Sequence, residues 1–297
     1  MTGYLRENGQ IGIRDHLLAL PSVVCSNRAA LAAGQAVGGV WVEHPLGCAQ
    51  IGADKEQTWR TLVGIGAHPN VRRTVVIGLG CEGVQAATIH QGILDRGREA
   101  AVYSIQTAGG TDQAAEMAAA ALRNAPPADR VPLPPERLIL GVEGLGLFGG
   151  RADPVVAAFR EAGGRVVRAL APGETAPEGA VVIDYAEPVP DGVPEVFMRA
   201  GAGDSETITG LVASGCHLVL APADAARIGG HPIAPVVRLG YDPALARALA
   251  DDMDGMVDAR TPDQWAAFLL SVADGTPTAA EEVGAALFAI ERLGPTL

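Results

Sequence analysis

The chain has 297 residues, enough for one large domain or two smaller ones, and it can bury a substantial core without disulfides. Its formal net charge of -12 argues against binding to nucleic acid or to an acidic membrane surface. No apolar run reaches the ~20 residues of a membrane helix. The N-terminus lacks the pattern of a signal peptide, so the four cysteines favour a reducing, cytoplasmic environment.

Short apolar runs alternate with alanine-rich segments along the chain. Strands are predicted at 16–20, 38–42, 73–78, 100–105, 137–142, 164–169, 180–184, 195–199, 217–221 and 233–239. Helices are predicted at 27–36, 54–66, 84–96, 111–124, 152–162, 205–214, 243–251, 262–272 and 278–292. This alternation is typical of βα units. We therefore predict an α/β fold of parallel sheets flanked by helices, in two Rossmann-like halves.

A proline-rich segment, APPADRVPLPPER, interrupts the alternation near the middle of the chain. Such a composition is typical of a connection between structured units. We predict a first α/β half at 1–125, which carries the cysteines, a linker at 126–136 and a second α/β half at 137–297.

Three cysteines each follow a predicted strand: Cys25 in LLALPSVVCSN, Cys48 in VWVEHPLGCAQ and Cys81 in TVVIGLGCEGVQ. The carboxyl ends of parallel strands converge on one crevice. Three thiols there could hold a metal ion or an iron–sulfur cluster with one coordination position open. Cysteine can also be a small apolar filler, which is our interpretation of Cys216, since it precedes its strand. The spacings form no CxxC pair.

Two polar residues beside these cysteines are candidate catalytic groups. His44 lies four residues before Cys48, where a histidine can be a ligand, a general base or a donor to a ligand. A surface histidine without a role is the alternative. Glu82 follows Cys81 and could accept a proton, bind a substrate hydroxyl or complement the dipole of the next helix.

Other polar and glycine residues at predicted strand ends are candidate substrate-binding groups. The turns GLGCEGVQ and QTAGGTD each lead into a helix whose N-terminus can bind an anion. Neither turn has the spacing of a dinucleotide fingerprint, and either can be a plain βα turn. Arg14 could pair with a carboxylate, although Asp15 is an alternative partner, and Asn27 could cap a helix or bond a cluster sulfide. The candidates are Arg14, Asn27, Gly109, Gly110 and Thr111, with Thr111 as the expected N-cap.

At these residues the sequence resembles the altronate/galactarate dehydratase family, whose relatives include the large subunit of sulfolactate sulfo-lyase. The matching segments are GYLRENGQIGIRDHLLALPSVVCSN, HPLGCAQ, HPNVRRTVVIGLGCEGVQ, DYAEPV, ETITGLVASGCHLVLAP and IGGHPIAPVVRLGYDP. The resemblance implies iron-dependent β-elimination of water from a sugar acid. The family's positions carry over to Cys25, His44, Cys48, Gln50, Cys81, Glu82 and Gln85, which adds Gln50 and Gln85 to the substrate-binding candidates.

The chain also departs from the family pattern. The family's central Cys-Gly-Gly-Ser-Asp element is replaced by GVEGLGLFGGRADP, and a segment with a Glu-Lys-Ser motif near 170–180 is missing. Arg199 stands where the family has an aspartate. An added positive charge favours a more anionic substrate, so we include Arg199 among the substrate-binding candidates. We expect a small dicarboxylate or a sulfonated hydroxy acid in preference to a six-carbon sugar monoacid.

The predicted function is that of a hydro-lyase or related lyase acting on a small hydroxylated carboxylate. The expected cofactor is an iron–sulfur cluster or Fe²⁺, with Zn²⁺ less favoured. The alternatives are a non-catalytic metal-binding subunit, which the missing central element favours, and a nucleotide-binding α/β protein. Because the family carries a small β-rich domain before this core, we expect a separate small β-rich subunit and a homo- or hetero-oligomer.

Overall fold

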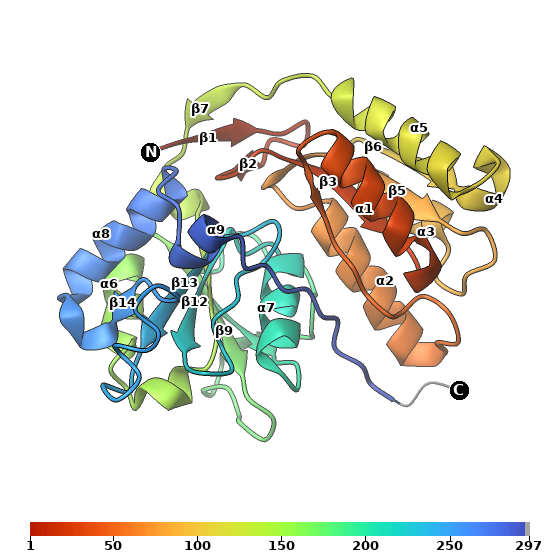
Figure 1. Ribbon diagram of the computed structural model, residues 1–297. Coiled ribbons are helices and arrows are strands. Elements are labelled where there is room, and N and C mark those ends of the chain that lie inside the picture. The colour runs from red at the N-terminus through yellow and green to blue at the C-terminus, as the bar shows by residue number, and fades with distance from the viewer. Residues whose placement is uncertain (295–297) are drawn as a thin grey trace.

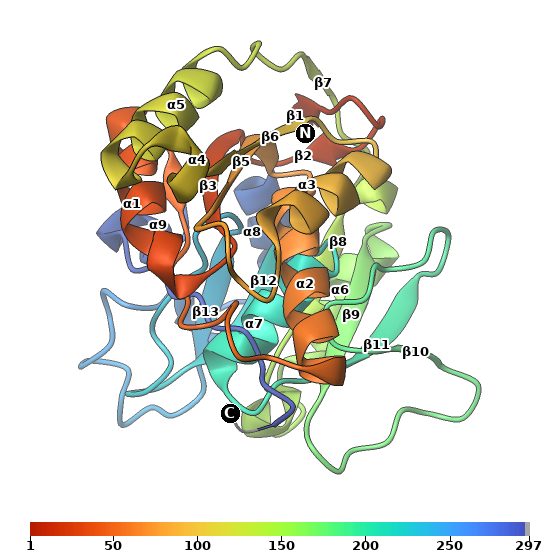
Figure 2. The ribbon, with the colours of Figure 1, turned by 90° about the vertical axis from the view of Figure 1, so that its right-hand side faces the viewer.

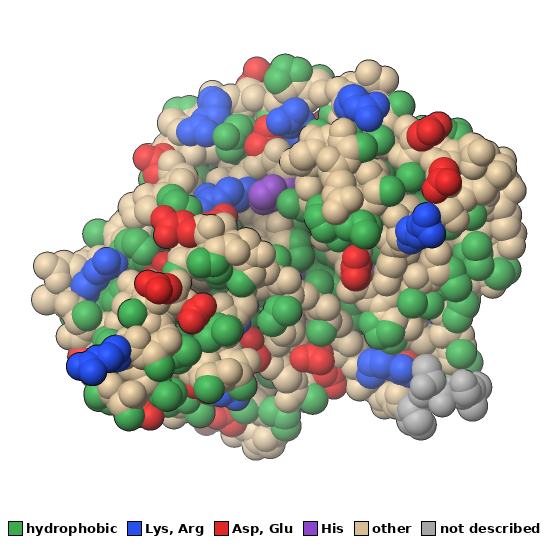
Figure 3. Space-filling model, in the orientation of Figure 1, with side chains coloured by type: hydrophobic (Ala, Val, Ile, Leu, Met, Phe, Trp, Pro, Cys, Tyr) green, Lys and Arg blue, Asp and Glu red, His purple; other side chains and the backbone are tan. Residues whose placement is uncertain are grey.

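The computed structural model describes residues 1–294 and has a mixed α/β architecture (Figure 1). It confirms the predicted parallel sheets flanked by helices. No helix of the described residues is long and apolar enough to span a membrane. On the face shown in Figure 3, acidic and basic side chains are interspersed without a continuous basic patch.

The first half contains a parallel sheet in the order β4-β3-β5-β6. Its strands are β3 (His16–Pro21), β4 (Val40–Trp41), β5 (Val71–Gly78) and β6 (Ala100–Ser104). Side chains alternate between its faces: Leu18 and Leu20 belong to the core with α2 (Gly52–Gly66) and α3 (Ala86–Asp95), whereas Ala19 packs with α1 (Asn27–Ala36) and α5 (Thr111–Arg123). A four-residue helix, α4 (Ile105–Ala108), leads from β6 into α5.

The second half contains a parallel sheet in the order β10-β11-β9-β8-β12-β13-β14. Its strands are β8 (Ile139–Val142), β9 (Arg165–Leu170), β10 (Val181–Ile183), β11 (Glu195–Arg199), β12 (Leu218–Ala223), β13 (Val236–Gly240) and β14 (Gly255–Met256). Helices α6 (Asp153–Glu161) and α8 (Pro262–Ala273) pack together over one face, and α7 (Asp204–Ala213) covers the other.

A small antiparallel sheet joins the N-terminus to the middle of the chain. It has the order β2-β1-β7, from β1 (Thr2–Leu5), β2 (Ile11–Gly12) and β7 (Arg130–Pro132). Part of the proline-rich segment is therefore a paired strand. The division into halves at 1–125 and 137–297, joined by a linker at 126–136, stays a prediction.

The two large sheets share one apolar core through α2 and α7, which lie side by side (Figures 1 and 2). Buried hydrogen bonds also join the segment that follows α2 to the segment that precedes β12. His68 Nε2 lies 3.0 Å from the Cys216 carbonyl oxygen, and Asn70 Nδ2 donates to the His217 carbonyl at 2.9 Å. At the crossing, a Cβ atom on Gly64 would lie 2.2 Å from the Ala213 carbonyl oxygen. Only glycine allows the helices to approach so closely.

Gly64→Ala is therefore expected to destabilise the protein, although alanine favours a helix. The added methyl must push two backbones apart, which costs about 1–3 kcal/mol and exceeds the gain of about 1 kcal/mol in helix propensity. Urea unfolding of the variant measures the loss. Ala53→Ser, at an exposed position of the same helix, is the control. Equal midpoints for both variants would mean that the helix crossing is not tight.

The predicted helix at 278–292 is wrong beyond its first turns. Only α9 (Ala279–Val283) forms, because Gly284 adopts a left-handed conformation with φ of 68° and ends it. The following chain is extended, and the Leu287 N–H donates to the Gly230 carbonyl at 2.9 Å. In Figure 1 this tail runs from the second half across to the first. There the Leu293 N–H donates to Asp54 at 2.9 Å. The predicted helix at 243–251 is a series of turns.

Candidate functional site

The three cysteines lie on consecutive loops at the carboxyl ends of neighbouring strands. Cys25 is in a short 3₁₀ helix (Val24–Ser26) after β3, Cys48 follows β4, and Cys81 follows β5. All three residues are exposed, whereas Cys216 is buried. We call the loops 22–26, 42–51 and 79–85 the cysteine edge.

Hydrogen bonds fasten these loops to one another. The Val24 N–H donates to the Leu46 carbonyl at 2.9 Å, and the Val84 N–H donates to the Gly47 carbonyl at 3.0 Å. Gly47 has a φ of 101°, and a Cβ atom there would lie 2.3 Å from the Ser22 carbonyl oxygen. The backbone beside each cysteine is therefore held in place by a neighbouring loop.

His44 is buried within this edge, and both of its ring nitrogens are engaged. Nε2 lies 2.9 Å from the Pro21 carbonyl oxygen, and Nδ1 accepts the Leu46 N–H at 3.2 Å. This pattern requires the neutral tautomer with its proton on Nε2. Burial lowers the pKa of the imidazole, with partial opposition from the bond to Pro21. His44 therefore joins the end of β3 to the loop that carries Cys48.

Glu82 is also buried, and its carboxylate holds the turn that carries Cys81. One oxygen accepts the Gly80 N–H at 2.6 Å, and the other accepts the Ser22 hydroxyl at 3.0 Å. Burial raises the pKa of this carboxyl, but these hydrogen bonds outweigh it and leave the pKa below its ordinary value. The carboxylate is ionised at neutral pH and committed to the loop.

Gln50 and Asn27 tie the same loops further. Gln50 is almost fully buried: its Oε1 accepts the Gly47 N–H at 2.9 Å and its Nε2 donates to Asp54 and Thr58. Asn27 Nδ2 donates to the His44 carbonyl at 3.1 Å, whereas its buried Oδ1 has no hydrogen-bond partner among the described residues. Gln85 precedes α3 and donates to the Glu82 carbonyl.

Other candidate residues are not brought to the cysteines. Arg14 precedes β3 and so lies at the opposite end of that strand from Cys25, where it pairs with Glu281 at 2.8 Å. Arg199 ends β11 in the other large sheet and pairs with Asp184 in an exposed position. Gly109, Gly110 and Thr111 form the junction of α4 and α5, where the N-cap is Gly110 and not Thr111.

The sequence analysis missed two side chains that support the cysteine edge. Ser22 binds Glu82, as described above. Gln106 lies against the turn before Cys81, since a Cβ atom on Gly80 would be 2.5 Å from its Oε1. Both follow strand ends, which is a signal that could have found them.

The donor set at this edge suits a soft metal, because three exposed thiolates are the ligands that iron and iron–sulfur clusters take. Among residues 1–294, however, no group of three or more His, Cys, Asp or Glu side chains lies close enough together to hold an ion. The loops are assembled, but the thiols are not gathered into a ligand set.

A second candidate site lies in the other half, at the carboxyl ends of β8, β9 and β11. It is a cavity of about 520 Å³, which we call the glycine-rich pocket. Its lining comes from the loop after β8, the ends of β9 and β11, and the start of α7: Glu143, Gly144, Gly146, Leu147, Arg168, Ala169, Leu170, Ala171, Pro172, Glu174, Phe197, Ala200, Gly201, Ala202, Gly203, Asp204, Thr207 and Arg227.

Glu143 stands out in this pocket. It follows β8, the residue is only 9% exposed, and its Oε2 has no hydrogen-bond partner among the described residues. Burial, and next the charge of Asp204, raise the pKa of this carboxyl to about 7. The group is therefore partly protonated at neutral pH and can donate a hydrogen bond.

Two segments of the chain match models of one protein family. Residues 3–128 match the family model described as D-galactarate dehydratase/altronate hydrolase, second domain. Residues 173–296 match the model described as D-galactarate/altronate dehydratase, C-terminal. The segment 129–172, which includes the loop after β8, lies between the two matches.

Three curated relatives match shorter parts. A (2R)-sulfolactate sulfo-lyase subunit beta from Chromohalobacter salexigens is 45% identical over 78 residues, 26% of this chain and 20% of the relative. Altronate dehydratases from Escherichia coli and Bacillus subtilis are 37% and 34% identical over 103 and 104 residues, each 31% of this chain and 21% of the relative. The matches thus span about a fifth of each relative's length. Because the two family models together cover most of the sequence, the chain belongs to the galactarate/altronate dehydratase family.

Proposed function

We propose that this chain is the core of a lyase that eliminates a group from a small hydroxylated carboxylate or sulfonate at the cysteine edge. The observation that carries the proposal is the placement of three exposed thiols on fastened loops of adjacent parallel strands. The family and the named activities of the relatives support elimination chemistry.

In this proposal Cys25, Cys48 and Cys81 hold iron or an iron–sulfur cluster. When bound, such a group would supply a Lewis acid that polarises the bond to the leaving oxygen. The chain's own residues hold the three cysteines in place. Since both ring nitrogens of His44 and both oxygens of Glu82 have partners, we propose that they position the loops carrying Cys48 and Cys81. Whether either is the general base that removes the α-proton stays a prediction.

The substrate proposal is less specific than the sequence analysis expected. The preference for a doubly anionic acid rested on Arg199, and its pairing with Asp184 offsets that charge. We therefore propose the shared chemistry of the relatives' substrates, a carboxylate with a neighbouring hydroxyl or sulfonate group. Large apolar side chains are exposed beside the cysteines, at Val24 and Ile51. They support a covering partner, either a second copy or a separate small subunit.

Replacement of any of the three cysteines by serine is expected to abolish iron retention, because a serine hydroxyl is a hard, weakly acidic ligand that replaces a soft thiolate. Anaerobic purification followed by iron and sulfide counts and an absorption spectrum measures this. Cys216→Ser is the matched control, since that thiol is buried away from the edge. Iron retained by all three variants would refute the assignment.

Turnover is tested on the same iron-loaded protein. Altronate, galactarate and (2R)-sulfolactate are assayed anaerobically, with and without any protein that copurifies. Turnover of one of them supports the lyase. Iron retained with no turnover in either condition would favour the alternative, a metal-binding subunit without catalysis.

A further inference from the structure

The sheet of the second half has a strand order that locates a ligand crevice. Counted from β8, and leaving out the edge strand β10, the strands run third, second, first, fourth, fifth and sixth: β11-β9-β8-β12-β13-β14. The chain leaves β8 toward β9 on one side and returns through α7 to β12 on the other. In such sheets, ligands bind beyond the carboxyl ends of the strands, where the order reverses. The glycine-rich pocket lies at this place, since Glu143, Gly144 and Gly146 follow β8.

The loop after β8 carries the fingerprint that the sequence analysis did not recognise. Residues 144–149 read Gly-Leu-Gly-Leu-Phe-Gly, which has the spacing GxGxxG, between the first strand of the sheet and α6. Gly144 and Gly149 have φ values of 62° and 57°, which explains glycine at both. The strand order, together with the motif, supports a role for this loop in ligand binding.

Gly146 has no such explanation within the protein. Its φ is not in the left-handed region, and a Cβ atom there would meet no heavy atom of the residues that the structure describes within 4 Å. Neither backbone strain nor packing therefore requires glycine at this position. A ligand that approaches the backbone closely does require it, which is the role of the second glycine in dinucleotide-binding loops.

The rest of the pocket suits the other parts of a nucleotide. Glu174 lies beyond the end of β9, the second strand, where an acidic residue can accept the hydroxyls of a ribose. Phe197, Pro172 and neighbouring alanines offer apolar surface for a base. Arg227 lines the pocket and pairs with Asp224, but its buried Nε has no hydrogen-bond partner among the described residues. Glu143 adds an Oε2 that is likewise without a partner among the described residues.

We propose that the glycine-rich pocket binds a nucleotide with a free ribose diol. Its phosphates lie against the loop 144–149 and Arg227, and Glu174 accepts the ribose hydroxyls. The size of the cavity is within the range of small-ligand sites. The loop lies in the segment 129–172, outside both family matches, and its residues depart from the Cys-Gly-Gly-Ser-Asp pattern that the family resemblance implies at this position.

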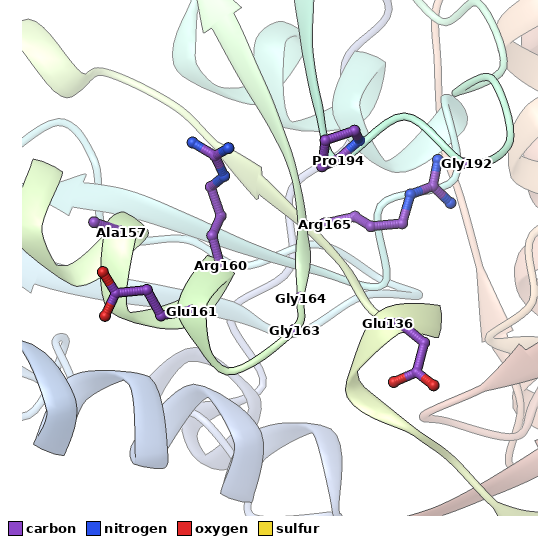
Figure 4. Close-up of a pocket in the computed structure, with 9 residues that line it drawn as sticks. All are labelled: Glu136, Ala157, Arg160, Glu161, Gly163, Gly164, Arg165, Gly192 and Pro194. Carbon is purple, nitrogen blue, oxygen red and sulfur yellow. The ribbon is translucent and has the colours of Figure 1, made fainter.

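A second hollow in the same half of the chain differs from the glycine-rich pocket in how its arginines are paired. The hollow in Figure 4, of about 570 Å³, lies at the amino ends of β9 and β11 and is lined by Arg160, Arg165 and the glycines 163 and 164. Its cations are already satisfied by the protein: Arg160 pairs with Glu195 at 3.1 Å, and Arg165 donates to the carbonyls of Val193 and Pro190. The glycine-rich pocket differs in that two buried polar atoms in its lining, Arg227 Nε and Glu143 Oε2, have no hydrogen-bond partner among the described residues.

Equilibrium dialysis of the full chain with ADP, NAD⁺, NADP⁺ and inorganic phosphate tests the proposal. Saturable binding of ADP or NAD⁺ is expected, with NADP⁺ weaker because its 2′-phosphate would meet the Glu174 carboxylate. Binding of both ADP and NAD⁺ identifies the nucleotide half as the ligand, and binding of NAD⁺ alone identifies a dinucleotide. No saturable binding of any nucleotide, or phosphate competing as well as ADP, would overturn it.

Two variants link binding to the pocket. Gly146→Val is expected to lose saturable binding while it folds normally, because its side chain enters open space. Glu174→Ala is expected to weaken binding about tenfold through the lost charged hydrogen bond. Ala157→Val, on the exposed face of α6, is the matched control and keeps wild-type affinity. Unchanged affinity in a folded Gly146→Val protein would contradict the proposed site.

Discussion

Acidification from about pH 7.5 to about pH 5 is expected to remove most of the unfolding free energy of this protein. Four histidines are almost fully buried: His44, His68, His217 and His231. Burial lowers the pKa of each, to about 4 for His217 and about 3 for His231. The folded state therefore favours the neutral form of all four.

The direction of the effect follows from the two states. An unfolded imidazole titrates near pH 6.5, whereas burial lowers the pKa of each of the four in the folded chain. Between these values the unfolded chain binds protons that the folded chain does not, so stability is complete above about pH 6.5 and falls as the pH falls. Each histidine contributes about 1.4 kcal/mol per pH unit, and the four together could offset a typical domain stability of about 5–15 kcal/mol within two or three units.

Urea unfolding at several pH values measures this slope. His217→Gln should reduce the slope of unfolding free energy against pH by about the contribution of one bound proton. The variant also loses the bonds that His217 makes to Ile11 and Ile139, which lowers its stability at every pH. A stability that stays constant from pH 7.5 to pH 5 would show that the buried imidazoles are protonated in the folded state or are not buried.

Replacement of Arg238 by methionine is expected to have the second large effect. The guanidinium is fully buried and makes two bonds to Asp204, at 2.8 and 2.7 Å. It also donates to the carbonyls of Pro222 and Gly229. Methionine would leave the Asp204 carboxylate and both carbonyls without their partner. Loss of one partner from a buried pair costs about 3–5 kcal/mol.

Arg199→Met is the matched control, because that arginine pairs with Asp184 in the exposed state and should contribute less than about 1 kcal/mol. Thermal and urea unfolding of the two variants should therefore differ clearly. If Arg238→Met were no less stable than Arg199→Met, the Arg238–Asp204 pair would be replaceable by packing alone. Since Asp204 lines the glycine-rich pocket, the same variant should also disturb that pocket.

The cysteine edge could be placed from sequence because its signals are local. Each cysteine follows a run of apolar residues, and a glycine or proline near it ends the strand. The alternation of strands and helices then implies that the ends of parallel strands meet. The same reasoning did not reveal what His44 and Glu82 touch, because their partners Pro21 and Ser22 lie 23 and 60 residues away in the chain.

The loop at 144–149 illustrates the same limit. Its glycine spacing was present in the sequence, but the motif has weight only when it follows the first strand of a sheet whose order reverses there. The chain after α9 is a second example of a feature that only the tertiary structure reveals. The sequence at 278–292 favours a helix, whereas the structure pairs Leu287 with Gly230 and carries the chain to Asp54.

The sequence by itself determined the α/β class, most strands and helices, and the position of the three cysteines at strand ends, because periodicity and turn residues act over a few positions. The tertiary structure decided which side chains are free to react and which are bound into the scaffold. It also decided the strand order that creates the glycine-rich pocket and the path of the tail. These depend on contacts between residues far apart in the chain, such as His68 with Cys216, 148 residues away, which no local pattern encodes.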